Sequence, residues 1–266
     1  MRKNSMLFLA LLFVSFQLAV AQTSSLVQPD VAIFYPKDFK AYKTLPSLAI
    51  TQDVSQEKPL PANWAVKPQF LQIEGKNAVQ FTFPEHVDLY GTGEVLGDLR
   101  RNGTDVTLWN TDNYEYGKFE GKQLYQAHPW VLGVRKDGSS FGILADHSWR
   151  QQIVLDDKVT FISEGPSFRV LVIMKDSPQE VMKALGELTG TMAMPPLWAL
   201  GYQQSRYSYY PDTSVKELAD EFRARKIPAD VIWMDIDYMD GFRVFTFDPE
   251  GFPNPKGLND YLHDKD

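Results

Sequence analysis

The sequence predicts a protein that is mainly β plus α/β, with an antiparallel β-sandwich followed by the start of a parallel α/β unit. Residues 26–174 carry short apolar or alternating runs separated by turn formers. A strand–helix–strand pattern follows after residue 196. The 266 residues are 44% hydrophobic, which is enough to build one or two domains with real cores.

The first part of the chain is predicted to consist of short strands. Turn formers such as Lys136-Asp137-Gly138-Ser139 separate the runs. Many short β runs with regular turn signals are typical of an antiparallel sandwich, here expected over residues 22–176. The clearest strands are expected at 78–83, 130–134, 141–145, 159–162 and 168–174.

A capped helix is predicted next, within a connector over residues 177–196. Ser177 is the expected N-cap, Pro178 stands at the first helical position, and Glu180 completes a capping box. Apolar residues follow at helical spacing, and Gly190 can end the helix. We interpret this helix as a connector that leaves the sandwich.

The part that follows is predicted to be a βαβ unit with parallel strands. Strands are expected at 197–203 and 229–235. Between them, a helix is expected to begin at Ser214, in a capping box with Glu217, and to end near Lys226.

Residues 197–266 are too few to close a barrel. A (β/α)8 barrel needs roughly 250 residues, so this stretch holds about two of the eight βα units. Two parallel strands leave much of their apolar surface bare. We therefore expect a truncated TIM barrel.

The first 21 residues resemble a signal peptide. Arg2 and Lys3 precede an apolar run over residues 6–16, and Ala19 and Ala21 fit a signal-peptidase site. The run is shorter than the roughly 20 residues that a spanning helix needs. We expect cleavage near Ala21 and a secreted or periplasmic protein without a membrane attachment.

Composition narrows the chemistry. The sequence has no cysteine, which excludes a disulfide scaffold, a thiolate metal site and a lipoprotein anchor. A net charge of −7 gives no electrostatic footprint for nucleic acid. The four histidines lack metal-ligand spacing, so no metal site is expected.

A glycine-rich stretch, Gly91-Thr92-Gly93-Glu94-Val95-Leu96-Gly97, needs an interpretation. Its third glycine lies one place too late for a dinucleotide-binding fingerprint, and the βαβ context is missing. The stretch is therefore predicted to be a tight turn of the sandwich.

Two places carry candidate binding residues. Asp235 is expected at the carboxyl end of a parallel strand, where barrel enzymes bind their ligands. Asp112 lies in a sandwich loop close to Trp109, a combination that suits sugar hydroxyls and a sugar face. At both places a carboxylate that caps a turn is the alternative.

Four segments resemble glycoside hydrolase family 31, the α-glucosidase family, and they occur in the family's order. The resemblance runs from about Leu26 to the last residue, and it is to the amino-terminal portion of the family's enzymes. The segments are 91–94 (GTGE), 108–112 (LWNTD), 195–203 (PPLWALGYQ) and 227–239 (IPADVIWMDIDYM).

The resemblance implies a galactose-mutarotase-like sandwich followed by a (β/α)8 barrel. It also implies retaining hydrolysis of α-glucosidic bonds by an aspartate nucleophile and an aspartic acid that protonates the leaving oxygen. The implied substrate is an α-glucoside oligosaccharide or polysaccharide. No cofactor is implied, because carboxylates and water suffice.

The resemblance also implies roles for four residues. Asp235 and Ile236 match positions that line the pocket of the cleaved glucose, and Asp112 matches a sandwich acid that reaches the same pocket. Tyr207 matches a tyrosine near the site. The nucleophile and the general acid are expected after Asp266, since Asp235 is followed by Ile236 where the family's nucleophile is followed by Met.

Two alternatives stay open. The chain could be a non-catalytic, carbohydrate-binding sandwich protein with a vestigial tail. Within the family, α-xylosidase specificity is the alternative to α-glucosidase specificity, because the pocket residues of later strands are not part of the sequence.

Overall fold

The computed structural model describes residues 19–20, 22–40, 59–113 and 123–265. The chain divides into two compact units, Met1–Thr191 and Met192–Asp266. The signal-peptide prediction falls mostly outside the described residues, since only Ala19 and Val20 of that segment are included. In the described part of the chain, no helix is long and apolar enough to cross a membrane.

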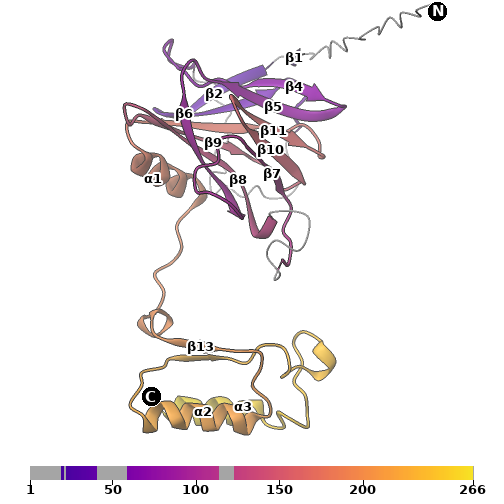
Figure 1. The fold of residues 1–266 in the computed structure, drawn as a ribbon, viewed down its shortest axis with the longest axis vertical. Helices are drawn as coiled ribbons and strands as arrows, with labels where there is room; N and C mark the ends of the chain where they lie inside the picture. Colours follow the sequence, from indigo (N-terminus) through magenta and orange to yellow (C-terminus); the bar gives the residue numbers. More distant parts are fainter. Residues whose placement is uncertain (1–18, 21, 41–58, 114–122, 266) are drawn as a thin grey trace, which may run out of the picture. The chain divides into compact units, whose positions relative to one another are not determined.

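The first unit is an antiparallel sandwich of two six-stranded sheets, which confirms the predicted fold class (Figure 1). The first sheet has the order β1 (Ala19–Val20), β4 (Gln69–Ile73), β5 (Lys76–Thr82), β11 (Lys158–Ser163), β10 (Gln151–Leu155) and β7 (Thr104–Leu108). The second sheet has the order β2 (Gln22–Gln28), β3 (Val31–Pro36), β12 (Val170–Lys175), β9 (Ser140–Ala145), β8 (Gln123–Arg135) and β6 (Val87–Val95).

Strands in the middle of the second sheet are buried on both faces. In β12, Val170 and Val172 belong to the core between the sheets, whereas Leu171 and Ile173 belong to a second apolar cluster on the outer face. Successive side chains of a strand point to opposite faces. Burial on both faces explains why this strand is a continuous apolar run rather than an alternating one.

Helix α1 (Pro178–Thr189) covers that outer face. Its predicted caps are confirmed, since the Ser177 side chain accepts a hydrogen bond from the amide of Glu180 and Gly190 has φ of 84°. Val181 and Leu188 pack in the same apolar cluster as Ile33 of β3. The helix that we interpreted as a connector is therefore packed against the sandwich and belongs to the first unit.

The second unit contains a parallel pair of strands with helices. In chain order it has a 3-10 helix (Leu197–Leu200), β13 (Gln203–Ser205), α2 (Asp212–Ala224), β14 (Val231–Trp233), a 3-10 turn (Asp240–Phe242) and α3 (Pro255–His263). Strands β13 and β14 pair in parallel, which confirms the βαβ prediction. Four buried residues form the core of this unit: Tyr209, Val215, Phe252 and Leu258.

In this unit, the start of the first strand and the start of α2 differ from the prediction. Residues 197–200 form a 3-10 helix, not a strand, and the strand begins only at Gln203. Short apolar runs of this kind do not distinguish a strand from a helix. Helix α2 begins at Asp212, so Ser214 lies inside it and its hydroxyl donates to the carbonyl of Tyr210.

The glycine-rich stretch is not a tight turn. Residues 91–95 lie within β6, whose pairing with β8 shifts register between Gly91 and Gly93 and again between Gly93 and Val95. Gly93 has φ of 87°, and a Cβ atom there would lie 2.5 Å from the carbonyl oxygen of Gln126. Glycine therefore serves a bulged strand here, where backbones approach closely.

Candidate functional site

The carboxyl edge of the parallel pair holds three of the predicted site residues. Ser205, the last residue of β13, is in register with Trp233, the last residue of β14. Tyr207 and Asp235 each follow two residues later. Equal offsets from a shared register place both residues at the same edge, where parallel βα structures bind ligands.

The two loops at this edge are joined by a hydrogen bond. The hydroxyl of Ser208 donates to Oδ2 of Asp237 at 2.7 Å. Asp237 is partly buried, while Asp235 is exposed. One carboxylate therefore holds the loops together, and the other is available to a ligand.

Asp235 has an unusual backbone conformation. Its φ is 64°, in the left-handed region, which Asp adopts more readily than most residues. This conformation separates Asp235 from Asp237, which would lie on the same side only in an extended chain. The two carboxylates thus have different surroundings, as the sequence left open.

The same edge exposes apolar surface. Tyr207 is 68% exposed, Ile236 40% and Trp233 57%. The indole Nε1 of Trp233 donates to Oε1 of Gln203 at 2.9 Å, which fixes the ring. An exposed carboxylate beside aromatic surface is suited to a polyhydroxylated ligand with an apolar face.

Asp112 lies in the first unit, after β7. Its neighbour Trp109 is 57% exposed, as the sequence suggested. Oδ1 of Asp112 accepts a hydrogen bond from the hydroxyl of Tyr125 at 2.8 Å. Sequence reasoning missed Tyr125, because its position within a strand gave no motif that could mark it.

Asp112 belongs to the first unit and Asp235 to the second. The structure defines the surroundings of each residue within its own unit. The second unit brings Tyr207, Asp235 and Ile236 to one edge. Asp112 forms its own cluster with Tyr125 on the sandwich. That all four residues line one pocket remains a prediction.

Asp248 is a turn-capping carboxylate. It accepts hydrogen bonds from the hydroxyl of Tyr210 and the amides of Glu250 and Gly251. The Tyr210 hydroxyl, followed by the Glu250 amide, lowers the pKa of the Asp248 carboxyl below its ordinary value. These bonds assign it to the local fold.

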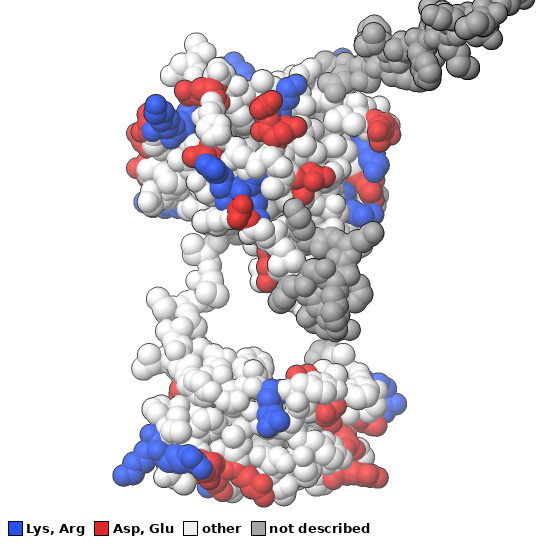
Figure 2. All heavy atoms as spheres, viewed as in Figure 1, with Lys and Arg blue, Asp and Glu red and all other residues white. Residues whose placement is uncertain are grey.

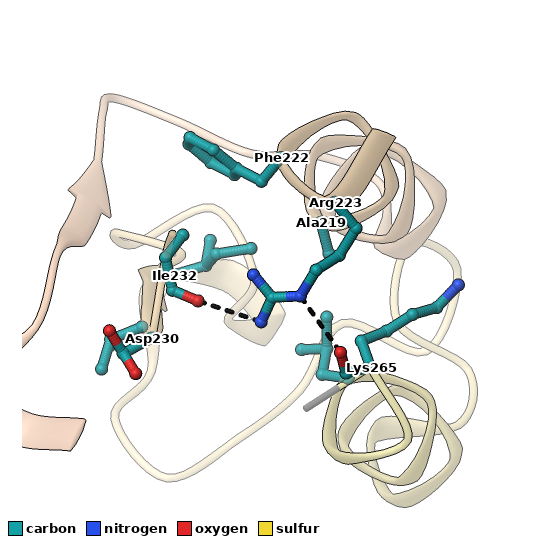
Figure 3. Close-up of a pocket in the computed structure, with 9 residues that line it drawn as sticks. Ala219, Phe222, Arg223, Asp230, Ile232 and Lys265 are labelled. Carbon is teal, nitrogen blue, oxygen red and sulfur yellow. Dashed lines mark hydrogen bonds between the residues drawn. The ribbon is translucent and has the colours of Figure 1, made fainter. Parts of the chain in front are cut away.

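A small cavity of about 80 Å3 lies between β14 and helices α2 and α3 (Figure 3). Arg223 of α2 reaches into it and donates to the carbonyl oxygens of Ala229 and Lys265, both at 3.1 Å. Because this guanidinium ties the segment before β14 to the segment after α3, we assign the cavity a structural role.

Charged and metal-ligating side chains are the next features to consider as a site. On the face shown in Figure 2, acidic and basic side chains are interspersed over the sandwich. Among the residues that the structure describes, no group of three or more His, Asp or Glu side chains could hold a metal ion.

The described residues thus form a β-sandwich followed by parallel βα structure with carboxylates at its carboxyl edge. Two family models match. Residues 67–153 match the glycosyl hydrolase 31 N-terminal galactose mutarotase-like domain, and residues 192–266 match the glycosyl hydrolases family 31 TIM-barrel domain. The chain belongs to glycoside hydrolase family 31, as the motifs indicated.

Relatives of known activity are similar over most of this chain. Alpha-glucosidase 2 of Bacillus thermoamyloliquefaciens is 40% identical over 203 residues, which cover 71% of this chain and 26% of that protein. The alpha-glucosidase of Saccharolobus solfataricus is 35% identical over 185 residues, which cover 67% and 26%. The chain thus spans about a quarter of the length of these curated relatives.

Solved structures give the same result. The family 31 alpha-glucosidase from Bacteroides thetaiotaomicron is 57% identical, with a TM-score of 0.63 over 69% of this chain and 31% of that one. A GH31 dextranase from Flavobacterium johnsoniae matches with a TM-score of 0.77 over 92% of this chain and 35% of that one. The dextranase is only 22% identical and supports the fold alone.

Proposed function

We propose that this chain is the amino-terminal part of a retaining glycoside hydrolase that acts on α-linked glucosides. The observation that carries the proposal is the shared carboxyl edge, where Tyr207 and Asp235 follow two parallel strands at equal offsets. The alpha-glucosidases among the relatives support the substrate class.

Asp235 is assigned to sugar binding in this proposal. An exposed carboxylate accepts hydrogen bonds from two neighbouring hydroxyls, and charge-assisted bonds of this kind are the stronger ones. Ile236 and Tyr207 supply apolar surface to the sugar ring. Asp112 contributes a second carboxylate from the sandwich.

The reaction itself needs two further carboxyl groups. In a retaining mechanism one carboxylate attacks the anomeric carbon, and a neutral carboxylic acid protonates the leaving oxygen. We assign both roles to residues that lie outside this sequence. Asp235 and Asp112 then hold the ring as it distorts toward the oxocarbenium-like transition state, so that their loss lowers kcat as well as raising KM.

The test joins residues 1–266 to the remaining barrel of the 57% identical Bacteroides thetaiotaomicron enzyme. We expect the folded chimera to release nitrophenol from a nitrophenyl α-glucoside, and the 266-residue chain alone to release none. A folded chimera that hydrolyses only the α-xyloside would establish α-xylosidase specificity instead. A folded chimera inactive on both substrates would contradict the proposal.

Substitutions in the chimera test the site. Asp235→Asn and Asp112→Asn should each lower kcat/KM by roughly ten- to 150-fold, which corresponds to a charged hydrogen bond of about 1.5–3 kcal/mol. Asp157→Asn, on an exposed turn between β10 and β11, is the matched control. Unchanged kinetics in both site variants would return these residues to a turn-capping role.

A carbohydrate-binding sandwich without catalysis is the second candidate, because Trp109 is exposed beside Asp112. This candidate predicts that the chain alone binds an α-glucan and that Trp109→Ala abolishes binding. An inactive chimera with intact binding would favour it over the hydrolase.

Export is the last part of the proposal. Its support is the basic start, the short apolar run and the small residues near Ala21. Mass spectrometry of the protein expressed in a Gram-negative bacterium should find an amino terminus near Gln22 in the periplasm. A soluble cytoplasmic product that retains Met1 would disprove export.

A further inference from the structure

We propose that Tyr125 is a positioning residue for Asp112, and that Glu94 fixes Tyr125 in turn. The inference rests on the proposed function, because only there is Asp112 assigned to the sugar. It also gives the glycine-rich 91–94 segment a role that the sequence did not suggest.

The segment that carries Asp112 runs along the start of β8. The amide of Thr111 donates to the carbonyl of Leu124 at 2.8 Å. The side-chain amide of Asn113 reaches the carbonyl of Gln123 at 3.5 Å. Backbone and side-chain bonds on both sides of Asp112 therefore hold its main chain against β8.

The side chain of Asp112 is exposed and needs a separate restraint. The hydroxyl of Tyr125 supplies it by donating to Oδ1 at 2.8 Å. A carboxylate has two oxygens and about four acceptor sites, so one bond to Oδ1 fixes the rotamer and leaves Oδ2 for a ligand. Among the described residues, no other side chain hydrogen-bonds this carboxylate.

Tyr125 lies in an irregular part of β8. Gly93 pairs with Ala127 and Val95 with Gln123, so β8 spans four residues where β6 spans two. The regular ladder is interrupted over this stretch, and the Oε2 atom of Glu94 accepts a hydrogen bond from the amide of Tyr125 at 3.1 Å. The side chain of Glu94 thus anchors the backbone that presents the tyrosine.

The glycines make this contact possible. Gly93 has positive φ and lies so close to β8 that a Cβ atom would be 2.5 Å from the Gln126 carbonyl. This close approach brings the next residue, Glu94, within reach of Tyr125. Gly93 therefore allows the close approach, Glu94 holds the backbone of Tyr125, and Tyr125 holds the side chain of Asp112.

The first test uses the 266-residue chain. Tyr125→Phe removes one hydroxyl and should raise amide hydrogen exchange over residues 109–113 by roughly three- to tenfold, as expected for the loss of one hydrogen bond. Tyr90→Phe removes a hydroxyl from β6, about seven residues away along the sheet, and should leave that exchange unchanged. Equal exchange in both variants would overturn the proposal.

The second test uses the active chimera. Tyr125→Phe should lower kcat/KM by roughly three- to tenfold with an unchanged melting temperature. Combined with Asp112→Asn, it should add nothing, because the two residues act as one unit. Glu94→Ala should have the same effect as Tyr125→Phe, and Glu94→Gln should restore activity because the amide oxygen still accepts.

The outcomes separate the two proposals. If Asp112→Asn has wild-type kinetics, the assigned role of Asp112 fails. If Asp112→Asn is impaired while Tyr125→Phe has wild-type kinetics, the role of Asp112 stands and the positioning role of Tyr125 is wrong. Additive losses in the double variant would also contradict positioning.

Discussion

Acidification should destabilise the sandwich through one partly buried histidine, His147. Its ring lies 4.4 Å from the ring of Phe168, and its Nδ1 accepts a hydrogen bond from the amide of Trp149. Burial lowers the pKa of His147 from 6.5 to about 4, and the Gln151 side chain opposes this only in part. A protonated imidazole could no longer accept the Trp149 amide.

The sign of the effect follows from proton binding. The unfolded chain takes up the proton near pH 6.5, whereas the folded chain takes it up only near pH 4. Between these pH values the unfolded state holds more protons, so the free energy of unfolding falls as the pH falls. Above pH 6.5 the imidazole is neutral in both states, and below pH 4 it is charged in both.

The expected loss is about 2.5 kcal/mol at pH 4.5 and about 3 kcal/mol once the pH is below 4. The measurement is urea denaturation at pH 7.5 and 4.5, followed by the fluorescence of Trp64 and Trp130, which are buried in the sandwich. Because carboxylates titrate in the same range, the informative quantity is the difference between wild type and His147→Gln.

The variant should lose about 2.5 kcal/mol less than the wild type over this interval. The matched control is His86→Gln, which removes an imidazole whose side chain is 75% exposed. Parallel pH profiles for wild type and His147→Gln would refute the assignment of the acid sensitivity to His147.

Three further predictions concern stability and are checked by the same denaturation at pH 7.5. Arg169→Leu should lower the free energy of unfolding by about 3–5 kcal/mol, because it leaves the Asp146 carboxylate without its cation. This carboxylate is 1% exposed and lies 2.6 Å from the guanidinium. Adding Asp146→Asn should recover part of the loss, and a full additional loss would argue against the ion pair. Gly93→Ala should lower the free energy of unfolding more than Gly138→Ala, since both glycines have positive φ but only a Cβ atom at Gly93 meets backbone atoms. Equal losses would mean that β6 can move away from β8. Leu188→Ala should cost about 2–5 kcal/mol because this fully buried side chain fixes α1 to the sheet, and a cost below about 0.5 kcal/mol would indicate that α1 is loosely attached.

Local patterns sufficed where a residue's role depends on its near neighbours in the sequence. The cap of α1 is an example, since Ser177 and Glu180 are three residues apart and Gly190 ends the same helix. The second strand of the parallel pair was also readable, because the apolar run Val231-Ile232-Trp233 follows an amphipathic helix. The family motifs added the expected site.

Local patterns were misleading where a choice depends on contacts across the fold. The apolar run at 197–200 fits a strand or a helix equally well, and the chain adopts a 3-10 helix with Leu197 and Leu200 exposed. The glycines at 91 and 93 indicate positive φ, but a turn and a bulged strand both use it. The pairing with β8 decided between them.

The sequence alone determined the class of fold and the succession of sandwich, helix and parallel βα unit. Its family motifs gave Asp112, Tyr207, Asp235 and Ile236 as candidates. Only the tertiary structure showed that Tyr125 donates a hydrogen bond to Asp112 and that Ser208 donates one to Asp237. The physical reason is distance along the chain. Hydrogen bonds between residues 13 or 29 positions apart depend on register and strand pairing, which no local pattern of residues encodes.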